Sequence, residues 1–186
     1  FTENMPASRT ITAVVDAKSP AAEIITKAGQ ALRDGRVIAY PTDTQYGLGV
    51  DPRVAEGVQR LFRAKRRPGE RAIPFVAANL QQVERCLGSL TPLGQQLAHR
   101  FWPGPLTLVI NAFPGLDPRL LGGRSSVAVR VPDHAVARAL TVELGYPLTA
   151  TSANVTGTAA ALSATEVVTA LGRSVAFVID AGQTEH

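Results

Sequence analysis

Val-Ile-Ala-Tyr-Pro-Thr-Asp-Thr-Gln-Tyr-Gly-Leu-Gly, residues 37–49, carries the strongest signal for the fold. Its apolar, β-branched start predicts a buried strand over residues 37–40, and Pro41, which has no N–H to give to a sheet, marks where that strand stops. The hydroxyl-bearing residues that follow therefore lie at the carboxyl end of the strand. Ligands of open α/β sheets bind beyond that end, so residues 42–46 are a candidate edge of a ligand pocket. The alternative is a polar turn with glycine at positive φ, the commoner structure for such a segment taken alone.

Length and composition limit the number of domains. The chain has 186 residues, 45% of them hydrophobic, which is enough for one core without disulfides or a structural metal. We expect one domain over residues 20–182, with an N-terminal extension at 1–19 and a tail at 183–186. No apolar run approaches the roughly 18–20 residues that span a bilayer, so we expect a soluble, cytoplasmic protein with no membrane partner. The net charge of +4 favours anionic ligands without identifying one.

Helix and strand signals alternate along the chain. Strands are predicted over residues 37–40, 73–77, 106–111, 127–131, 148–151 and 175–179. Helices are predicted from Ser19-Pro20 to Gly35 and over residues 54–62, 80–87, 91–101, 132–144 and 163–171. This alternation predicts an α/β fold, with a twisted sheet covered by helices on at least one face.

A cationic loop, Lys-Arg-Arg-Pro-Gly-Glu-Arg, occupies residues 65–71. Arg67 can hold two phosphate oxygens through its planar fork, while Lys65 adds a movable point charge. A solvated basic loop is the alternative, and composition alone favours it. The sequence has neither a Gly-x-x-x-x-Gly-Lys-Ser/Thr nor a Gly-x-Gly-x-x-Gly signature, so any phosphate site is of another kind.

Two further segments carry candidate polar groups. Phe-Trp-Pro-Gly-Pro-Leu-Thr (101–107) is mostly a packing element, but Thr107 can offer one hydroxyl to a ligand. Thr-Ala-Thr-Ser-Ala-Asn-Val-Thr-Gly (149–157) is a strand that ends in small polar residues, among them Ser152 and Asn154, so that a ligand can approach the backbone. The alternative for this segment is a turn that precedes a helix.

Arg130 stands inside an apolar strand, where a buried guanidinium requires an anionic partner. The sequence does not favour either of two partners for Arg130: a ligand, or an internal carboxylate such as that of Asp133 or Asp51. The three histidines form neither a metal-ligand spacing nor a Ser/His/Asp arrangement, so we expect no protein-held metal.

Taken together, these segments resemble the YrdC-like threonylcarbamoyl-adenylate synthases, the YrdC/Sua5-type domains, whose hallmark is a Lys-x-Arg and Ser-x-Asn tetrad. Here the tetrad is Lys65, Arg67, Ser152 and Asn154. The likeness also covers residues 41–47, 101–107, 129–134 and 151–157, in family order and across roughly residues 20–182. It implies a YrdC/RibB-like α/β fold with a twisted mixed sheet and a positively charged concave cavity, and it implies ATP, L-threonine and bicarbonate as substrates.

The resemblance also implies a reaction, in which a carbamate formed from threonine and bicarbonate attacks the ATP α-phosphate and displaces pyrophosphate. A tRNA threonylcarbamoyl transferase then uses the adenylate to modify tRNA adenosine. Lys65 and Arg67 are the implied catalytic residues and hold the ATP triphosphate. Ser152 and Asn154 are implied to hold the nucleotide and its phosphates, and Thr107 is implied to make a further contact with ATP. Thr42 and Arg130 are implied to hold the threonine, and Mg²⁺ is expected on the ATP phosphates. Such a site needs charge neutralisation and positioning more than a covalent nucleophile.

This sequence departs from the family pattern at Ala72 and Val76, where many relatives have proline or glycine and then histidine. Two other functions are kept as alternatives. A carbamoyl-adenylate module would use carbamoyl phosphate in place of threonine and bicarbonate. A non-catalytic RNA-binding module fits the basic charge of the chain, but the aromatic residues lie in apolar runs rather than on an exposed stacking platform.

Overall fold

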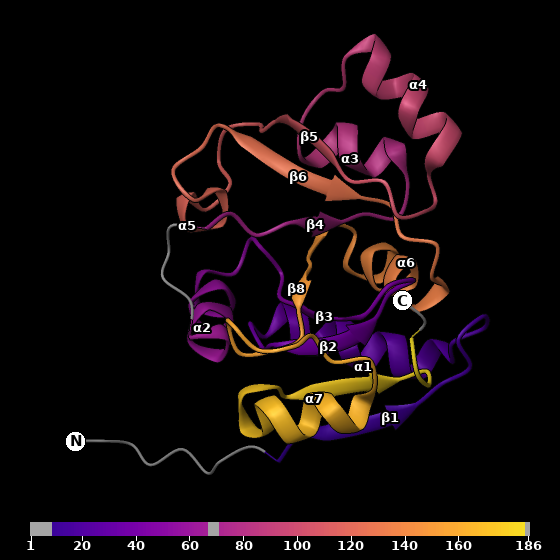
Figure 1. Cartoon of the computed structure of the whole chain (residues 1–186), viewed down its shortest axis with the longest axis vertical. Helices are drawn as coiled ribbons and strands as arrows, with labels where there is room; N and C mark the ends of the chain where they lie inside the picture. Colours follow the sequence, from indigo (N-terminus) through magenta and orange to yellow (C-terminus); the bar gives the residue numbers. More distant parts are fainter. Residues whose placement is uncertain (1–8, 67–70, 185–186) are drawn as a thin grey trace.

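A computed structural model of the chain describes residues 9–66 and 71–184, and Figure 1 shows its arrangement. The elements follow in this order: β1 (Ile11–Val14), α1 (Ala22–Arg33), β2 (Ile38–Pro41), β3 (Tyr46–Gly49), α2 (Ala55–Lys65), β4 (Phe75–Val76), α3 (Leu80–Cys86), α4 (Pro92–Phe101), β5 (Leu108–Asn111), α5 (Pro118–Leu121), β6 (Ser126–Arg130), α6 (Ala135–Leu144), β7 (Leu148–Thr149), β8 (Thr151–Ser152), α7 (Ala164–Leu171), the 3-10 turn η1 (Gly172–Ser174) and β9 (Phe177–Asp180). The predicted α/β fold is confirmed.

The strands form two mixed sheets rather than the single sheet expected from the sequence. One has the order β1-β9-β2-β3-β8 and the other the order β5-β6-β4-β7. The predicted strand over residues 148–151 explains the difference, because it is divided at Ala150. Its first half, β7, pairs with β4, and its second half, β8, pairs with β3, while the Ala150 N–H donates to Pro74. One short run of chain therefore joins both sheets.

The hairpin of β2 and β3 is the centre of the first sheet. β2 ends at Pro41 as predicted, but the glycines that follow are strand residues of β3 and do not have positive φ. Gly49 is required because Tyr40 packs against it, and a Cβ there would lie 2.8 Å from Tyr40 Cε1. The glycine signal in this segment reflects close packing of a buried tyrosine rather than a turn.

Alternation along β2 divides the hydrophobic core between the two faces of the first sheet. Ile38 and Tyr40 pack in one cluster with α1 and α6, whereas Ala39 packs in the other, which includes residues of α2 and α7. All three side chains are fully buried. Successive strand residues point to opposite faces, which explains why this run is apolar throughout instead of alternating.

Helix starts follow the predicted signals with two exceptions, α1 and α6, and α5 was not predicted. The helix predicted from Pro132 begins only at Ala135, with His134 as its N-cap. Thr91 and Ser163 cap α4 and α7 through their side-chain oxygens. Ser19 was expected to cap the first helix, but α1 begins at Ala22 and its N-cap, Ala21, makes no side-chain bond. The Ser19 N–H is instead held by Asp16 in a preceding turn.

The segment assigned to the N-terminal extension contains β1, a strand that the sequence analysis did not predict. β1 pairs in parallel with β9 at the edge of the first sheet. Ile11 and Val14 are largely exposed, so the strand has no buried apolar face to mark it in the sequence. Among the described residues, no helix combines the length and the apolar character that crossing a membrane requires.

Candidate functional site

The turn between β2 and β3 is shaped by the hydroxyl of Thr42. Its Oγ1 donates to Gln45 O at 2.7 Å and accepts from the N–H groups of Thr44 and Gln45, both at 3.2 Å. Thr42 is also buried. Because its proton is already donated within the turn, Thr42 fixes the direction in which its neighbours point, and its predicted contact with threonine stays a prediction.

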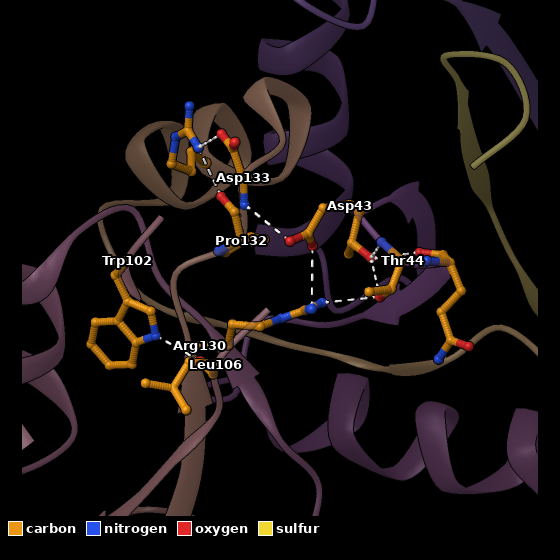
Figure 2. Close-up of polar contacts among 10 residues, drawn as sticks. Asp43, Thr44, Trp102, Leu106, Arg130, Pro132 and Asp133 are labelled. Carbon is orange, nitrogen blue, oxygen red and sulfur yellow. Dashed lines mark hydrogen bonds and ion pairs between the residues drawn. The ribbon is translucent and has the colours of Figure 1, made fainter. Parts of the chain in front are cut away.

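Arg130, at the end of β6 in the second sheet, reaches the same turn. Figure 2 shows its guanidinium between Asp43 and Thr44: Nη1 lies 3.2 Å from Asp43 Oδ1, and Nη2 donates to Thr44 Oγ1 at 3.4 Å. The backbone N–H of Asp133 donates to Asp43 Oδ2 at 3.4 Å. The ion pair is mostly buried, with 15% of the Arg130 side chain and 16% of the Asp43 side chain exposed.

The internal carboxylate that pairs with Arg130 is therefore that of Asp43, and the two candidates named from the sequence are wrong. The Asp51 carboxylate binds Arg53 at 2.8 Å, and the Asp133 carboxylate lies 3.2 Å from Arg138. Each of those acids has an arginine close in sequence, whereas Asp43 meets Arg130 only because the two sheets come together.

A second cluster forms around Lys65, the last residue of α2. Its Nζ donates to Ser152 O at 2.6 Å, to Ser152 Oγ at 3.2 Å and to Asn154 Oδ1 at 2.6 Å. The Thr156 N–H donates to the Lys65 carbonyl, which ties residues 152–158 to the end of α2. Lys65 is only 3% exposed. Three members of the predicted tetrad therefore meet, while Arg67 lies outside the described residues.

The polar network continues through Asn154. Its Oδ1 also accepts from Ser152 Oγ at 2.6 Å, and its Nδ2 donates to Thr158 O at 2.5 Å. These bonds fix the side chain and its loop before any ligand binds. The printed bonds use the three Nζ hydrogens and the Ser152 hydroxyl hydrogen within the cluster, so as it stands the cluster offers a phosphate chiefly the positive charge of the Lys65 ammonium.

The β2–β3 hairpin places the Asp43–Arg130 ion pair and the Lys65 cluster at the same end of the first sheet. Pro41 pairs with Tyr46 next to the turn, and the following residue, Gly47, pairs with Ser152. Thr107 is exposed just before β5 and makes no hydrogen bond to any candidate residue within the described part of the chain. Its role as an ATP contact stays a prediction.

Tyr46 is a positioning residue to which the sequence analysis gave no role of its own. Its hydroxyl donates to Gly182 O at 2.7 Å and accepts from the Ala181 N–H at 3.3 Å, so it anchors the segment after β9 beside the hairpin. Burial, with a smaller contribution from Asp180, raises the pKa of this hydroxyl to about 12. Tyr46 therefore stays a neutral donor near neutral pH.

His134 caps α6 through Nδ1, which accepts from the Val136 N–H at 3.3 Å. Burial lowers the pKa of His134, and the nearby Asp43 carboxylate opposes that shift. A neutral imidazole is the form that can accept this bond at Nδ1. Among the described residues, no group of three or more His, Cys, Asp or Glu side chains is arranged to hold a metal ion.

A family model that covers Sua5, YciO and YrdC, described as "Telomere recombination", matches residues 30–186. The chain belongs to the Sua5/YciO/YrdC family. This match confirms the resemblance drawn from the ordered motifs. The matched residues include both the Asp43–Arg130 ion pair and the Lys65 cluster.

Several family members similar to this chain bear the name threonylcarbamoyl-AMP synthase. The protein from Bacillus subtilis is 37% identical over 161 residues, which are 86% of this chain and 46% of that protein. The protein from Photobacterium profundum is 38% identical over 83% of this chain and 84% of its own length. The chain therefore spans about half of one relative and most of the other.

Solved structures agree with the fold. Pyrococcus abyssi Sua5 complexed with L-threonine superposes with a TM-score of 0.89 at 34% identity, over 94% of this chain and 51% of that one. Escherichia coli YciO gives a TM-score of 0.85 at 24% identity, over 95% of this chain and 86% of that one, and this match shows the fold alone.

Proposed function

We propose that this chain is the catalytic domain of a threonylcarbamoyl-AMP synthase, which forms threonylcarbamoyl-AMP and pyrophosphate from ATP, L-threonine and bicarbonate. The observation that carries the proposal is the buried cluster of Lys65, Ser152 and Asn154 in a chain whose relatives bear that name. The enzyme class is a nucleotidyltransferase, and its product serves the modification of tRNA by a threonylcarbamoyl transferase.

The chemistry of the cluster fits attack on a nucleotide phosphate. The Lys65 ammonium neutralises charge on the phosphates, and Ser152 and Asn154 fix its position through bonds of 2.6–3.2 Å. Positioning and electrostatic stabilisation supply most of the catalysis in phosphoryl transfer, so no covalent nucleophile is required. Arg67 completes the triphosphate clamp in this proposal, and Thr107 adds a further contact to the nucleotide.

Arg130 is the proposed contact for the threonine carboxylate. Its guanidinium carries a permanent charge, is mostly buried and faces the turn that Thr42 shapes. The P. abyssi Sua5 structure, which contains L-threonine, supports an amino-acid site within this fold.

Mg²⁺ is proposed to arrive on the ATP phosphates. The Lys65 cluster contributes a cation, a hydroxyl and an amide rather than carboxylates, and that set suits phosphate oxygens instead of a protein-held divalent ion. When bound, the metal neutralises phosphate charge, while the residues of this chain hold and orient the substrates.

Pyrophosphate release from the purified chain tests the proposed function. The assay supplies ATP and Mg²⁺ and withholds L-threonine or bicarbonate in turn, with carbamoyl phosphate as a separate arm. Release that needs both threonine and bicarbonate supports the synthase. Release that needs only carbamoyl phosphate would transfer the assignment to a carbamoyl-adenylate module. Salt-sensitive RNA binding without any release, and unchanged in Lys65→Ala, would favour an RNA-binding module.

A further inference from the structure

Strand β5 has an open side that no other described strand covers. It lies at one end of the order β5-β6-β4-β7 and pairs only with β6. The Ala112 N–H donates to Ser125 O at 2.9 Å. Because the backbone groups of an antiparallel strand point alternately to either side, those of Leu108 and Ile110 also point to β6. The N–H and C=O of Val109 therefore point away from the sheet, and they have no hydrogen-bond partner among the described residues.

The chain covers one end of this open side and leaves the rest uncovered. The Phe113 N–H donates to Leu87 O at 2.6 Å, and Gly88 packs so closely there that a Cβ would lie 2.0 Å from Asn111 O. A groove of about 150 Å³ remains beside Val109, lined by β5 on one side and on the other by Ser89, Thr91 and Gly94. The groove lies where the next strand of the sheet would pair.

Exposed apolar side chains surround the groove. Val109 is 70% exposed and Phe101 is 46% exposed, and Phe113 is exposed as well. Trp102 Nε1 donates to Leu106 O at 2.6 Å, so the end of α4 lies beside the start of β5, whereas Phe113 follows the end of β5. Edge strands that stay unpaired are usually protected by charged side chains or proline, and β5, Leu-Val-Ile-Asn, has neither. The open side of β5 therefore has the features of a pairing surface.

The charge at both ends of β5 is positive. The Arg100 guanidinium carbon lies 5.7 Å from the centre of the Phe101 ring, and Arg124 comes just before Ser125, which pairs with Ala112. Neither arginine forms an ion pair with a carboxylate of the described residues, and α4 contains no acidic residue. Two copies of this chain paired antiparallel through β5 would bring these like charges together, whereas an acidic segment would neutralise them.

We propose that the open side of β5 binds an extended, acidic segment of a partner protein, which adds to the second sheet as a further strand. The backbone of that segment pairs with Val109, an apolar side chain enters the groove, and carboxylates lie near Arg100 and Arg124. Figure 1 shows β5 with α3 and α4 at the end of the molecule away from β1 and α7. The proposal is independent of the synthase function, because it uses no residue of the Lys65 cluster.

The test titrates the nitrogen-15-labelled chain with a blocked peptide, Glu-Asp-Val-Ile-Val-Asp-Glu, and follows the backbone amides by NMR. We expect shifts concentrated in residues 91–94 and 107–111, with slower hydrogen exchange at the Val109 N–H once it is paired. A peptide with lysine at the four acidic positions should bind at least about 10-fold more weakly at low salt.

Val109→Pro removes the outward N–H and leaves the bonds to β6 in place. It should weaken peptide binding by roughly 3- to 10-fold, as expected for one backbone hydrogen bond. Val14→Pro is the matched control on the edge strand β1, since Val14 is 79% exposed. There the N–H groups of Ile11 and Val15 donate toward β9, so that of Val14 points outward, and this variant should bind the peptide as the wild type does.

Shifts confined to another part of the protein, or none at millimolar peptide, would overturn the inference whether or not the variants fold. Equal binding of the acidic and the lysine peptide would overturn it too, as would a folded Val109→Pro protein with wild-type affinity. Wild-type protein that dimerises in sedimentation, and loses the dimer in Val109→Pro, would show that a second copy rather than an acidic partner occupies β5. None of these results bears on the synthase proposal.

Discussion

Replacing Lys65 with methionine tests the nucleotide-binding role of its cluster. Methionine keeps the apolar stem but removes Nζ, which makes two bonds of 2.6 Å and one of 3.2 Å to Ser152 and Asn154. A hydrogen bond to a charged group contributes about 1.5–3 kcal/mol, whereas burying an ammonium costs several kcal/mol that the variant regains. We therefore expect a net loss of roughly 1–3 kcal/mol in the free energy of unfolding, measured by urea titration.

The effect on ATP should be separable from the effect on stability. Without the ammonium, affinity for a non-hydrolysable ATP analogue should fall by roughly 10- to 100-fold, or about 1.4–2.8 kcal/mol, measured by calorimetry. Lys27→Met is the matched control: its side chain is 60% exposed and pairs with Glu23 on α1. That control should cost under about 0.5 kcal/mol and leave ATP binding unchanged. A folded Lys65→Met protein with wild-type affinity for the analogue would refute the assignment of the phosphate site.

Three further predictions concern stability. Gly49→Ala should cost about 1–3 kcal/mol in urea titrations, since its Cβ would lie 2.8 Å from Tyr40 Cε1, whereas Gly47→Ala, whose nearest contact is 3.4 Å, should cost clearly less; equal costs would contradict the packing argument. Arg66→Gly should stabilise the fold by roughly 0.5–1 kcal/mol, because Arg66 has a φ of 48°, and a less stable variant would show that this residue is not strained. Burial lowers the pKa of His134, so its contribution to stability is fully present above about pH 6.5 and is lost as the pH falls toward the folded-state pKa. His134→Asn keeps a capping side chain but has no titrating group, so it should reduce this loss of stability at low pH. A variant whose stability depends on pH as the wild type's does would contradict this prediction.

The sequence predicted the parts of this structure that depend on local pattern. The strand ending at Pro41 and the helix that Thr91 caps are determined by nearby residues, and both are confirmed. The division into two sheets was not predictable, because β7 and β8 read as one strand and only tertiary pairing separates them at Ala150.

The same distinction applies to the candidate site. Lys65 and Asn154 were identified through ordered motifs, and the structure brings their side chains to 2.6 Å from each other. The partner of Arg130 was assigned incorrectly, because Asp43 is 87 residues away in sequence and meets it only across two sheets. A signal was nevertheless present, since Asp43 lies in the polar turn predicted to edge a pocket.

The sharpest test of the synthase proposal is mass detection of the product formed from ATP, Mg²⁺, L-threonine and carbon-13-labelled bicarbonate by the purified chain. We predict threonylcarbamoyl-AMP that carries one labelled carbon, with none formed when threonine or ATP is withheld and with a strong loss in Lys65→Met. Folded protein that binds ATP yet forms no labelled adenylate would contradict the proposal.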